Sequence, residues 1–407
     1  MKIPFSPPFI NDAVIEEVNN TLESGWITSG PKVKELEHTL ASQIGTSHVV
    51  CVNSWSSGAM LLLRWLGIGA GDEVIVPAYT YCATALSVIH CGATPVIVDV
   101  KDDFTIDPEK VAQAITVNTK AIIAVDFGGL MCDYDGIYEA ISRKNNNGFS
   151  FHTSSPNLAN YNRPVLISDA AHSIGAVYKG KKSGAVADFT IFSLHAVKNV
   201  TTAEGGAISF NLPSTLKADD VYKEMKLWSL NGQNKDAFSK TNGGGWRYDI
   251  LFPGLKVNMP DICAAIGLAQ LKQYETSLLQ ERKRVALRYK DFFQKNTWAI
   301  CPALEDDSRT SCYHIYALRI KGIAEEQRDQ MIEKITSEGV SVNVHFIPLP
   351  MLTAFKNIGF DINHYPIAYD LYKNEISLPI YPQLTNGQID YICEAVLASY
   401  NKVVLND

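Results

Sequence analysis

Seven short apolar runs, separated by polar or helical segments, constrain the fold of this chain more than any other feature. Parallel strands whose two faces are both covered by helices have this continuous apolar composition. The alternation therefore predicts an α/β fold with a doubly wound sheet of mainly parallel strands, whose ligands gather at the carboxyl ends of the strands. The runs are residues 48–52, 73–77, 94–100, 121–127, 164–170, 188–192 and 205–210.

Helical patterns flank this region on both sides. Asn11 or Asp12 is expected to cap a first helix, and a second helix with apolar residues at positions 33, 36, 40 and 44 is expected to end at Gly45. A long helix is predicted over residues 260–295, with Pro260 in its first turn. Polar, glycine-rich or asparagine-rich loops are predicted at residues 145–163 and 230–254.

The last hundred residues predict a smaller α+β domain. Strands are expected at residues 313–320 and 340–346, and helices at about residues 324–338 and 386–401. The chain is therefore divided into a large domain, residues 1–255, and a second part, residues 256–407, with the long connecting helix and the small domain.

Composition indicates a small-molecule partner. The 407 residues include 46% hydrophobic residues and carry a net charge of −7 without a basic block, which argues against nucleic acid or an anionic membrane as the main partner. The eight cysteines form no C-x-x-C pair, so they are interpreted as reduced residues, and no metal site is expected. No signal-peptide pattern or membrane-spanning run is found, and a cytoplasmic location is expected.

Three strand-end features combine into one candidate site. Asp169 ends one apolar run, Lys198 lies shortly after another, and residues 53–60 form a serine-containing turn that opens a helix. Such a turn can bind phosphate through free backbone N–H groups and hydroxyls. Each feature also has an ordinary interpretation, as a structural carboxylate, a solvated lysine and a helix cap.

Together these groups are the parts that pyridoxal phosphate (PLP) requires. A lysine amine forms a Schiff base with the cofactor aldehyde, and a carboxylate keeps the pyridine nitrogen protonated so that the ring withdraws electrons. Tyr81, in another strand-end segment, is a candidate aromatic residue against the face of the cofactor. His314 and His345 are further candidates for the cleft, with a structural role as the alternative.

The chain resembles the DegT/DnrJ/EryC1/StrS family of PLP-dependent sugar aminotransferases over nearly its whole length. The resemblance implies fold type I, with a mostly parallel seven-stranded sheet in the large domain, and a homodimer with active sites at the interface. It rests on the segments at residues 24–37, 71–85, 94–100, 105–111, 168–176, 187–208, 258–271 and 375–385.

The resemblance also implies roles for single residues. Lys198 matches the catalytic lysine, Asp169 the partner of the pyridine nitrogen, His172 the contact to the ring hydroxyl, and Tyr81 the stacking aromatic residue. Ser193, Ser56 and Ser57 resemble the phosphate-binding set, and Lys256 is the candidate that reaches the cofactor phosphate of the neighbouring subunit.

Three positions depart from the family pattern. The phosphate turn reads Ser54, Trp55, Ser56 where Ser-Gly-Thr is usual, and Lys256 begins a segment in which Asn-x-Arg is usual. Asp126 stands where many members carry histidine, which puts in doubt any role inferred from that position.

The implied reaction has two halves. Glutamate converts the cofactor to pyridoxamine phosphate, and the amine then passes to a ketone, at carbon 4, of a nucleotide-linked keto-deoxysugar used for a surface polysaccharide or glycoconjugate. Candidate sugar-nucleotide contacts come from two polar segments: Trp26, Thr28, Trp246, Arg247 and Tyr248.

Alternatives remain open for the acceptor and for the chemistry. A cyclitol or a 3-keto sugar would require the same motifs. A related PLP-dependent dehydratase would carry histidine in place of the lysine, whereas this chain keeps Lys198. A regulatory protein that has kept the fold without turnover is the remaining alternative.

Overall fold

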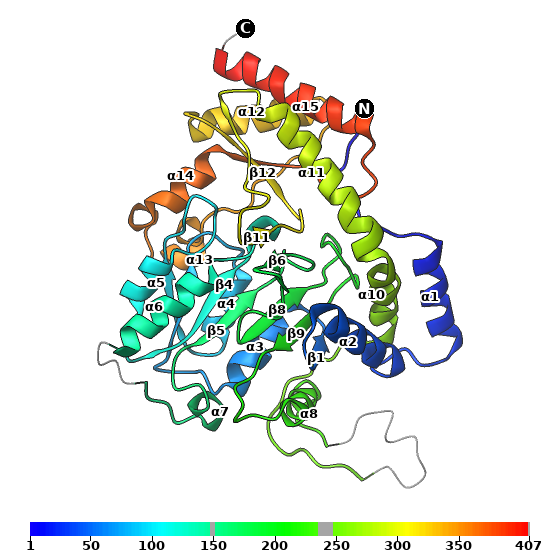
Figure 1. Ribbon diagram of the computed structural model, residues 1–407, viewed down its shortest axis with the longest axis vertical. Coiled ribbons are helices and arrows are strands. Elements are labelled where there is room, and N and C mark those ends of the chain that lie inside the picture. Colours follow the sequence, from blue (N-terminus) through cyan, green and yellow to red (C-terminus); the bar gives the residue numbers. More distant parts are fainter. Residues whose placement is uncertain (147–150, 235–246, 406–407) are drawn as a thin grey trace.

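The seven apolar runs form the strands of one seven-stranded sheet in the computed structural model, which describes residues 1–146, 151–234 and 247–405 (Figure 1). The sheet order is β1-β9-β8-β5-β4-β2-β3. The strands are β1 (Val49–Val52), β2 (Glu73–Pro77), β3 (Thr94–Val98), β4 (Thr119–Val125), β5 (Val165–Asp169), β8 (Phe189–Ser193) and β9 (Gly206–Phe210).

The sheet is mostly parallel, as predicted. Strands β2, β3, β4, β5 and β8 pair in parallel, whereas β9 is antiparallel to both β8 and β1. Parallel neighbours need a crossover connection, usually a helix. The connection between β8 and β9, residues 194–205, contains no helix and carries Lys198, so the chain returns antiparallel.

Helices cover both faces of this sheet. On one face, apolar residues of α3 (Trp55–Trp65), α4 (Ala83–His90) and α8 (Ala218–Trp228) join the same buried cluster as one set of strand residues. On the other face lie α5 (Pro108–Ala114) and α6 (Tyr134–Asn146). Helices α2 (Pro31–Ile44) and α10 (Asp261–Gln273) pack there as well. The alternation of strand side chains between these clusters explains why the strands are apolar on both faces.

The amino-terminal helices begin and end at the predicted signals. Helix α1 (Asp12–Glu23) is capped by Asn11, whose side chain accepts a hydrogen bond of 3.2 Å from the backbone N–H of Val14. Helix α2 (Pro31–Ile44) ends at Gly45, which has a φ of +83°. A residue with a side chain would be strained in this left-handed conformation, so glycine ends the helix at low cost.

The predicted long helix is interrupted by one π-helical turn. Helix α10 (Asp261–Gln273) passes through η2 (Tyr274–Leu278) into α11 (Leu279–Phe293), and Pro260 is the residue before the first turn. Helix α10 packs against α1 and α2, whereas α11 packs against α15 (Asn386–Tyr400). Figure 1 shows this helical rod running from the large sheet to the carboxyl-terminal helices. The domain boundary at residues 255–256 stays a prediction.

One predicted strand of the carboxyl-terminal part is wrong. Residues 340–346 form only isolated bridges, Ile3 with Val340 and Asn343 with Ser377. The small antiparallel sheet instead consists of β10 (Ala299–Ile300), β12 (Tyr316–Ile320) and β13 (Glu375–Leu378). Residues 340–346 are not a strand of this sheet, and two of them, His345 and Phe346, line a cavity at the carboxyl ends of the large sheet's strands.

The remaining elements include a second three-stranded sheet, in which β6 (Val177–Tyr178) lies between β11 (Arg309–Thr310) and β7 (Lys181–Lys182). Helix α12 (Glu325–Ser337) matches its prediction, and the loop expected at residues 145–163 contains the short helix α7 (Pro156–Ala159). Further elements are α13 (Thr353–Lys356), α14 (Pro366–Asn374), η1 (Phe127–Gly129), η3 (Leu349–Met351), η4 (Ile362–His364) and η5 (Asn401–Leu405).

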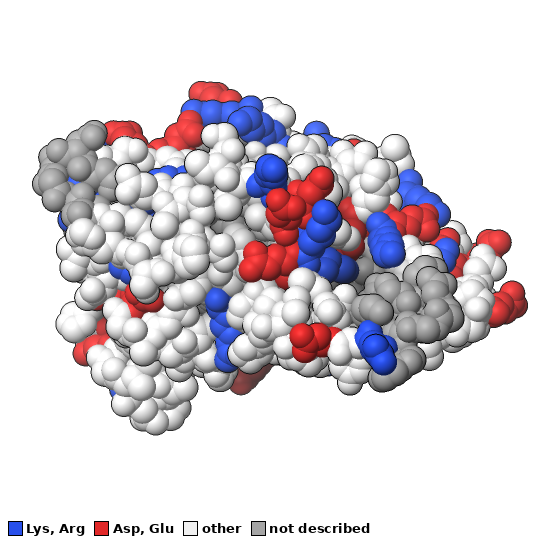
Figure 2. Space-filling view, turned by 90° about the horizontal axis from the view of Figure 1, so that it is seen from below, with Lys and Arg blue, Asp and Glu red and all other residues white. Residues whose placement is uncertain are grey.

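The face of the molecule in Figure 2 carries charges of both signs. Figure 2 shows basic and acidic side chains interspersed on the face that it displays, without a broad area of one sign. A nucleic-acid surface would instead concentrate lysine and arginine. Among the described residues, no helix is long and apolar enough to cross a membrane.

Candidate active site

A cavity lies at the carboxyl ends of the central strands. It has a volume of about 490 Å³ and is lined by the last residues of β4, β5 and β8, which are Val125, Asp169 and Ser193. Residues of the small sheet region and the amino-terminal segment close its other side. This is the edge at which doubly wound sheets bind ligands.

Asp169 is a buried carboxylate at the base of this cavity. Its Oδ2 accepts a hydrogen bond of 2.8 Å from the Thr84 hydroxyl, and its Oδ1 accepts one of 3.2 Å from the backbone N–H of Ala171. Burial raises the pKa of Asp169 to about 6, although these hydrogen bonds and the charge of Lys198 act in the opposite direction. The carboxylate therefore gains from a cationic N–H partner in the cavity.

Lys198 lies opposite, in the turn between β8 and β9. The backbone N–H of Lys198 donates a hydrogen bond of 2.9 Å to the carbonyl of His195, which fixes this turn. Burial lowers the pKa of Lys198 to about 8, and the charge of Asp169 opposes this shift only in part. A substantial fraction of the amine is therefore neutral near physiological pH, as a nucleophile or base requires.

The turn at the start of α3 supplies the polar end of the cavity. Ser54 caps the helix, because its hydroxyl accepts a hydrogen bond of 3.1 Å from the backbone N–H of Ser57. Ser54, Ser56 and Ser193 line the cavity, whereas Ser57 does not and is bonded instead to Ser54. Hydroxyls beside a helix amino terminus fit a phosphate group.

Trp55 occupies the position where the family usually has glycine. Its indole N–H donates a hydrogen bond of 3.0 Å to the carbonyl of Ile191, and the side chain is 6% exposed. The indole thus packs into the core below the turn and still leaves Ser54 and Ser56 on the cavity wall. The departure from the family pattern is accommodated by packing.

Gly206 permits the close contact between β9 and this turn. A Cβ at Gly206 would lie 2.6 Å from the carbonyl carbon and 2.7 Å from the carbonyl oxygen of Ser54. Because backbone atoms cannot rotate away, we expect Gly206→Ala to destabilise the protein by about 1–3 kcal/mol and to weaken PLP binding about tenfold. Urea unfolding and a PLP titration measure both effects.

Gly387→Ala is the matched control for this substitution, since its added Cβ meets nothing within 4 Å. Equal unfolding midpoints and equal PLP affinities for the two variants would contradict the predicted clash.

Aromatic side chains form the wall above Asp169 and Lys198. Tyr81 lines the cavity and is 61% exposed, with its ring 5.9 Å from that of Phe346. His172 also lines it, and its ring stacks on Phe346 at 5.7 Å. An aromatic wall, a buried carboxylate, a lysine and a hydroxyl-bearing helix start together fit a flat, phosphorylated pyridine such as PLP.

His314 and His345, both candidates from the sequence, line this cavity, whereas the sequence did not single out three polar residues near them: Thr84, Ser377 and Glu375. Thr84, which bonds Asp169, lies in the first turn of α4 just after β2, a position that its strand-end location could have indicated. His345 reaches the cavity with its Nδ1 atom 2.8 Å from the hydroxyl of Ser377, which in turn donates to Glu375. Contacts between such distant segments leave no local pattern in the sequence.

Several predicted substrate contacts, and the predicted cofactor contact Lys256, lie outside this cavity. Trp26 is partly buried, and its indole N–H bonds the carbonyl of Ser29, while Thr28 is exposed. Lys256 bonds the side chain of Asn258, and Arg247 and Tyr248 are exposed. None of these residues lines the cavity of this single chain. Trp246 lies outside the described residues.

Asp126 has a structural role at the end of β4, where it holds neighbouring segments together through hydrogen bonds. It is fully buried and accepts hydrogen bonds from the backbone N–H of Cys132 and from three hydroxyls, those of Tyr134, Ser168 and Ser173. The carboxylate does not line the cavity. Within the described residues, no group of three or more histidine, cysteine or acidic side chains could hold a metal ion.

Known proteins resemble the chain over almost its full length. The sequence profile of the DegT/DnrJ/EryC1/StrS aminotransferase family matches residues 8–146 and 155–397. The chain is 36% identical to the spore coat polysaccharide biosynthesis protein SpsC of Bacillus subtilis, over 97% of this chain and 96% of the relative. It is 32% identical to the UDP-4-amino-4-deoxy-L-arabinose–oxoglutarate aminotransferase of Shewanella sediminis, over 99% and 98% of the two chains.

A solved structure resembles the fold equally closely. The PMP-form of the putative sugar aminotransferase Spr1654 from Streptococcus pneumoniae superposes with a TM-score of 0.95 at 45% identity, covering 99% of this chain and 100% of that chain. A PLP-form of the same protein superposes with a TM-score of 0.94.

Proposed function

Because the chain belongs to the DegT/DnrJ/EryC1/StrS aminotransferase family and is a PLP-dependent sugar aminotransferase, we propose that it aminates a nucleotide-linked keto-deoxysugar with glutamate as donor. Carbon 4 is the proposed site of amination, and a surface polysaccharide or glycoconjugate is the proposed destination. The observation that carries the proposal is that Asp169 and Lys198 line one cavity, where the charge of each affects the pKa of the other. The serine-containing turn at the start of α3 lines the same cavity.

The names of the relatives support the finer assignment. One relative is named for a UDP-linked 4-amino-4-deoxy sugar and for oxoglutarate, the keto acid that glutamate becomes when it gives up its amine. Another is named for polysaccharide biosynthesis.

Different residues of the cavity would have different roles in a transamination. PLP, when bound, supplies an aldehyde and an electron-withdrawing ring. Asp169 would keep a proton on the pyridine nitrogen, and the hydroxyls of Ser56 and Ser193 would bind the phosphate. Lys198 would first attach the cofactor and then, as a free amine, take a proton from the donor carbon and return it at the neighbouring carbon.

A substrate panel tests the proposal. The PLP-loaded enzyme is mixed with glutamate and with UDP-, dTDP- or GDP-linked 4-keto-6-deoxy sugars, and mass spectrometry detects the replacement of a keto oxygen by an amine. The panel includes a 3-keto sugar and a carbocyclic ketone as competing acceptors, and alanine and aspartate as competing donors. Amination of only the carbocyclic ketone, or donation only by alanine or aspartate, would overturn the proposal.

We also propose that Lys256 completes the active site of a second subunit. It lies outside the cavity of its own chain but beside the phosphate turn region, since the backbone N–H of Asn53 donates a hydrogen bond of 2.8 Å to the carbonyl of Val257. A two-fold dimer would bring one such segment from each chain to the other chain's site.

Mixing two inactive variants tests this role. Lys198→Ala and Lys256→Ala homodimers are unfolded together, refolded and assayed. If each site uses one lysine from each chain, about a quarter of all sites regain both lysines, and activity rises to about a quarter of the wild-type value. Activity equal to the mean of the two homodimers would mean that Lys256 acts within its own chain.

Arg247 is proposed to contact the diphosphate of the acceptor. Replacing it with alanine should raise KM for the sugar nucleotide about 10- to 100-fold, because hydrogen bonds to charged groups contribute about 1.5–3 kcal/mol. The rate of the glutamate half-reaction, followed by cofactor absorbance, should stay at the wild-type value. An unchanged KM, or an equal loss in both half-reactions, would remove Arg247 from the acceptor site.

A further inference from the structure

Asn199, the residue after Lys198, has its side-chain amide fixed in one orientation. It is 6% exposed, and its Nδ2 lies 2.9 Å from the carbonyl oxygen of Cys312 and 3.1 Å from the hydroxyl of Tyr274. A carbonyl oxygen can only accept a hydrogen bond, and the Tyr274 hydroxyl already donates its proton to the carbonyl of Ile174 at 2.7 Å. Both neighbours therefore require the NH₂ group, so the amide oxygen faces the other way.

This orientation determines where His314 carries its hydrogen. The Nδ1 atom of His314 lies 2.8 Å from the Oδ1 atom of Asn199. Since that oxygen can only accept, Nδ1 must carry a hydrogen. Burial, followed by the charges of His172 and Lys198, lowers the pKa of His314 well below its usual value, so the ring is neutral. A neutral ring protonated at Nδ1 has a free lone pair at Nε2.

His172 has the opposite tautomer. Its Nδ1 atom accepts a hydrogen bond of 3.3 Å from the backbone N–H of Gly128, so a neutral ring carries its hydrogen at Nε2. Burial holds the pKa of His172 well below its usual value, and the charges of Lys198 and His345 lower it further. The cavity wall thus has one imidazole that can donate and one that can accept.

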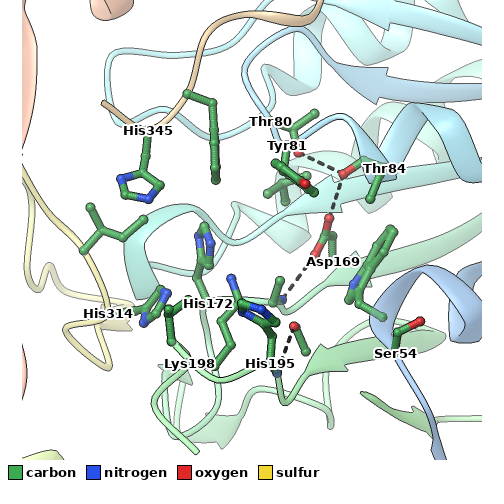
Figure 3. Close-up of a pocket in the computed structure, with 18 of the residues that line it drawn as sticks. Ser54, Thr80, Tyr81, Thr84, Asp169, His172, His195, Lys198, His314 and His345 are labelled. Atoms are coloured by element: carbon green, nitrogen blue, oxygen red, sulfur yellow. Dashed lines mark hydrogen bonds between the residues drawn. The ribbon is translucent and has the colours of Figure 1, made fainter. Parts of the chain in front are cut away.

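The two rings are neighbours on the wall that also holds Lys198. Their centroids are 4.6 Å apart, and both side chains line the cavity (Figure 3). Among the described residues that line it, Lys198 is the only lysine or arginine. Because Asn199 follows Lys198 directly, its hydrogen bond ties the His314 ring to the turn that carries the lysine.

We propose that His314 is a positioning residue whose Nε2 lone pair accepts a hydrogen bond from the amine of Lys198. An amine with one N–H held in this way keeps its own lone pair in a fixed direction, which favours proton transfer to and from the substrate carbon. His314 itself gains no proton in this step. The proposal rests on the proposed role of Lys198, but the tautomers of the two histidines do not.

Nitrogen NMR tests the tautomers without turnover. In cofactor-free protein labelled with ¹⁵N-histidine, the signals of His314 and His172 are assigned by their loss in His314→Gln and His172→Gln. We expect a protonated Nδ1 in His314 and a protonated Nε2 in His172 at neutral pH. A protonated Nε2 in His314, or a charged His314, would overturn the proposal.

Two substitutions at Asn199 test whether this residue fixes the tautomer of His314. Asn199→Asp keeps an oxygen that accepts from Nδ1, so His314 should retain its tautomer, whereas Asn199→Leu should release it. Retention in both variants, or loss in both, would contradict the assignment of Asn199 as the residue that fixes the ring.

Single-turnover kinetics with glutamate test the positioning role. In PLP-loaded protein, His314→Phe should slow the proton-transfer step about 10- to 100-fold, with glutamate Kd within about twofold of wild type. A primary isotope effect with α-deuterated glutamate should report the same step. His314→Gln, whose amide oxygen can accept, should recover most of the rate.

Equal rates in His314→Phe and His314→Gln, or a loss confined to Kd, would overturn the positioning role. Failure of the proposed function would look different: wild-type protein itself would then show no lysine-bound cofactor and no reaction with glutamate.

Discussion

Lys198→Ala protein is expected to lose covalent attachment of PLP and more than about 10⁴-fold of its transamination rate. The substitution removes two contributions at once, the amine that attaches the cofactor and the group that moves the proton. General acid–base catalysis alone is typically worth 10²–10⁴-fold. Reduction with borohydride followed by mass spectrometry measures attachment, and single turnover with glutamate measures the rate.

The variant should still bind PLP non-covalently, because Asp169, Ser56 and Ser193 remain in the cavity. Lys181→Ala is the matched control, since Lys181 is exposed on β7 and does not line the cavity. A cofactor still reduced onto the chain of the Lys198→Ala variant would identify another lysine as the attachment site.

The large sheet could be predicted from the sequence because each of its strands can be identified from a short stretch of residues. A strand covered on both faces must be apolar throughout, and this leaves an unbroken run in the sequence. Strand ends then placed Asp169 and Lys198 at one edge, where the structure brings them together with Ser193, a residue that only the family resemblance had indicated. The antiparallel β9 follows from a short, helix-free connection that is also visible in the sequence.

The small sheet was less predictable because its pairing is not local. Residues 340–346 alternate apolar and polar side chains as a strand would, yet only Val340 and Asn343 form bridges. Strand β13 contains a buried acidic residue, Glu375, which hid its strand character. Its carboxylate is accommodated by the backbone N–H of His345 and by Ser377, partners that only the folded chain brings together.

Two hydrogen bonds near the cavity could not be predicted for the same reason. Thr84 and Asp169 are 85 residues apart, and Asn199 and His314 are 115 residues apart, so neither hydrogen bond has a sequence signature. A single chain also leaves Lys256 and Arg247 outside the cavity. If their proposed roles are correct, the missing geometry belongs to the dimer and to the bound acceptor.

Asp169→Asn protein without cofactor is expected to be more stable than wild type at pH 7.5, while its activity falls. The raised pKa of Asp169, about 6, means that the folded protein binds this proton more tightly than the unfolded chain does. The ionised carboxylate therefore opposes folding. This cost is absent below about pH 4 and complete above about pH 6, and a shift of about two units corresponds to at most about 3 kcal/mol.

Asparagine removes the charge without removing the hydrogen-bonding geometry. Its amide oxygen can accept from the Ala171 N–H, and its NH₂ can donate to the Thr84 hydroxyl, which also has Thr80 as a partner. We expect the urea midpoint of the cofactor-free variant to exceed that of wild type at pH 7.5 and to match it near pH 4. Equal midpoints at both pH values would contradict a destabilising charge at Asp169.

Asp126→Asn is the matched comparison, because Asp126 is also buried but is surrounded by four donors and does not line the cavity. An NH₂ group there must face at least one donor, so this variant should lose about 1–3 kcal/mol of stability. Burial raises the pKa of Asp126 as well, so opposite signs at the two carboxylates would show that the hydrogen-bond donors around each carboxylate, and not burial alone, decide whether both of its oxygen atoms are needed for the fold.

The same carboxylate should govern the affinity for PLP. An ionised Asp169 attracts a protonated pyridine nitrogen, so wild-type affinity should fall as the pH drops through about 6, where the carboxylate takes up its proton. Asp169→Asn should bind PLP about 100-fold more weakly at pH 7.5. Its affinity should no longer fall as the pH drops through about 6; this fall is the acidic limb of the wild-type profile. A titration of cofactor absorbance from pH 5 to pH 8 measures both effects. An acidic limb that persisted in Asp169→Asn would assign the pH dependence to the cofactor phosphate and leave Asp169 with a structural role.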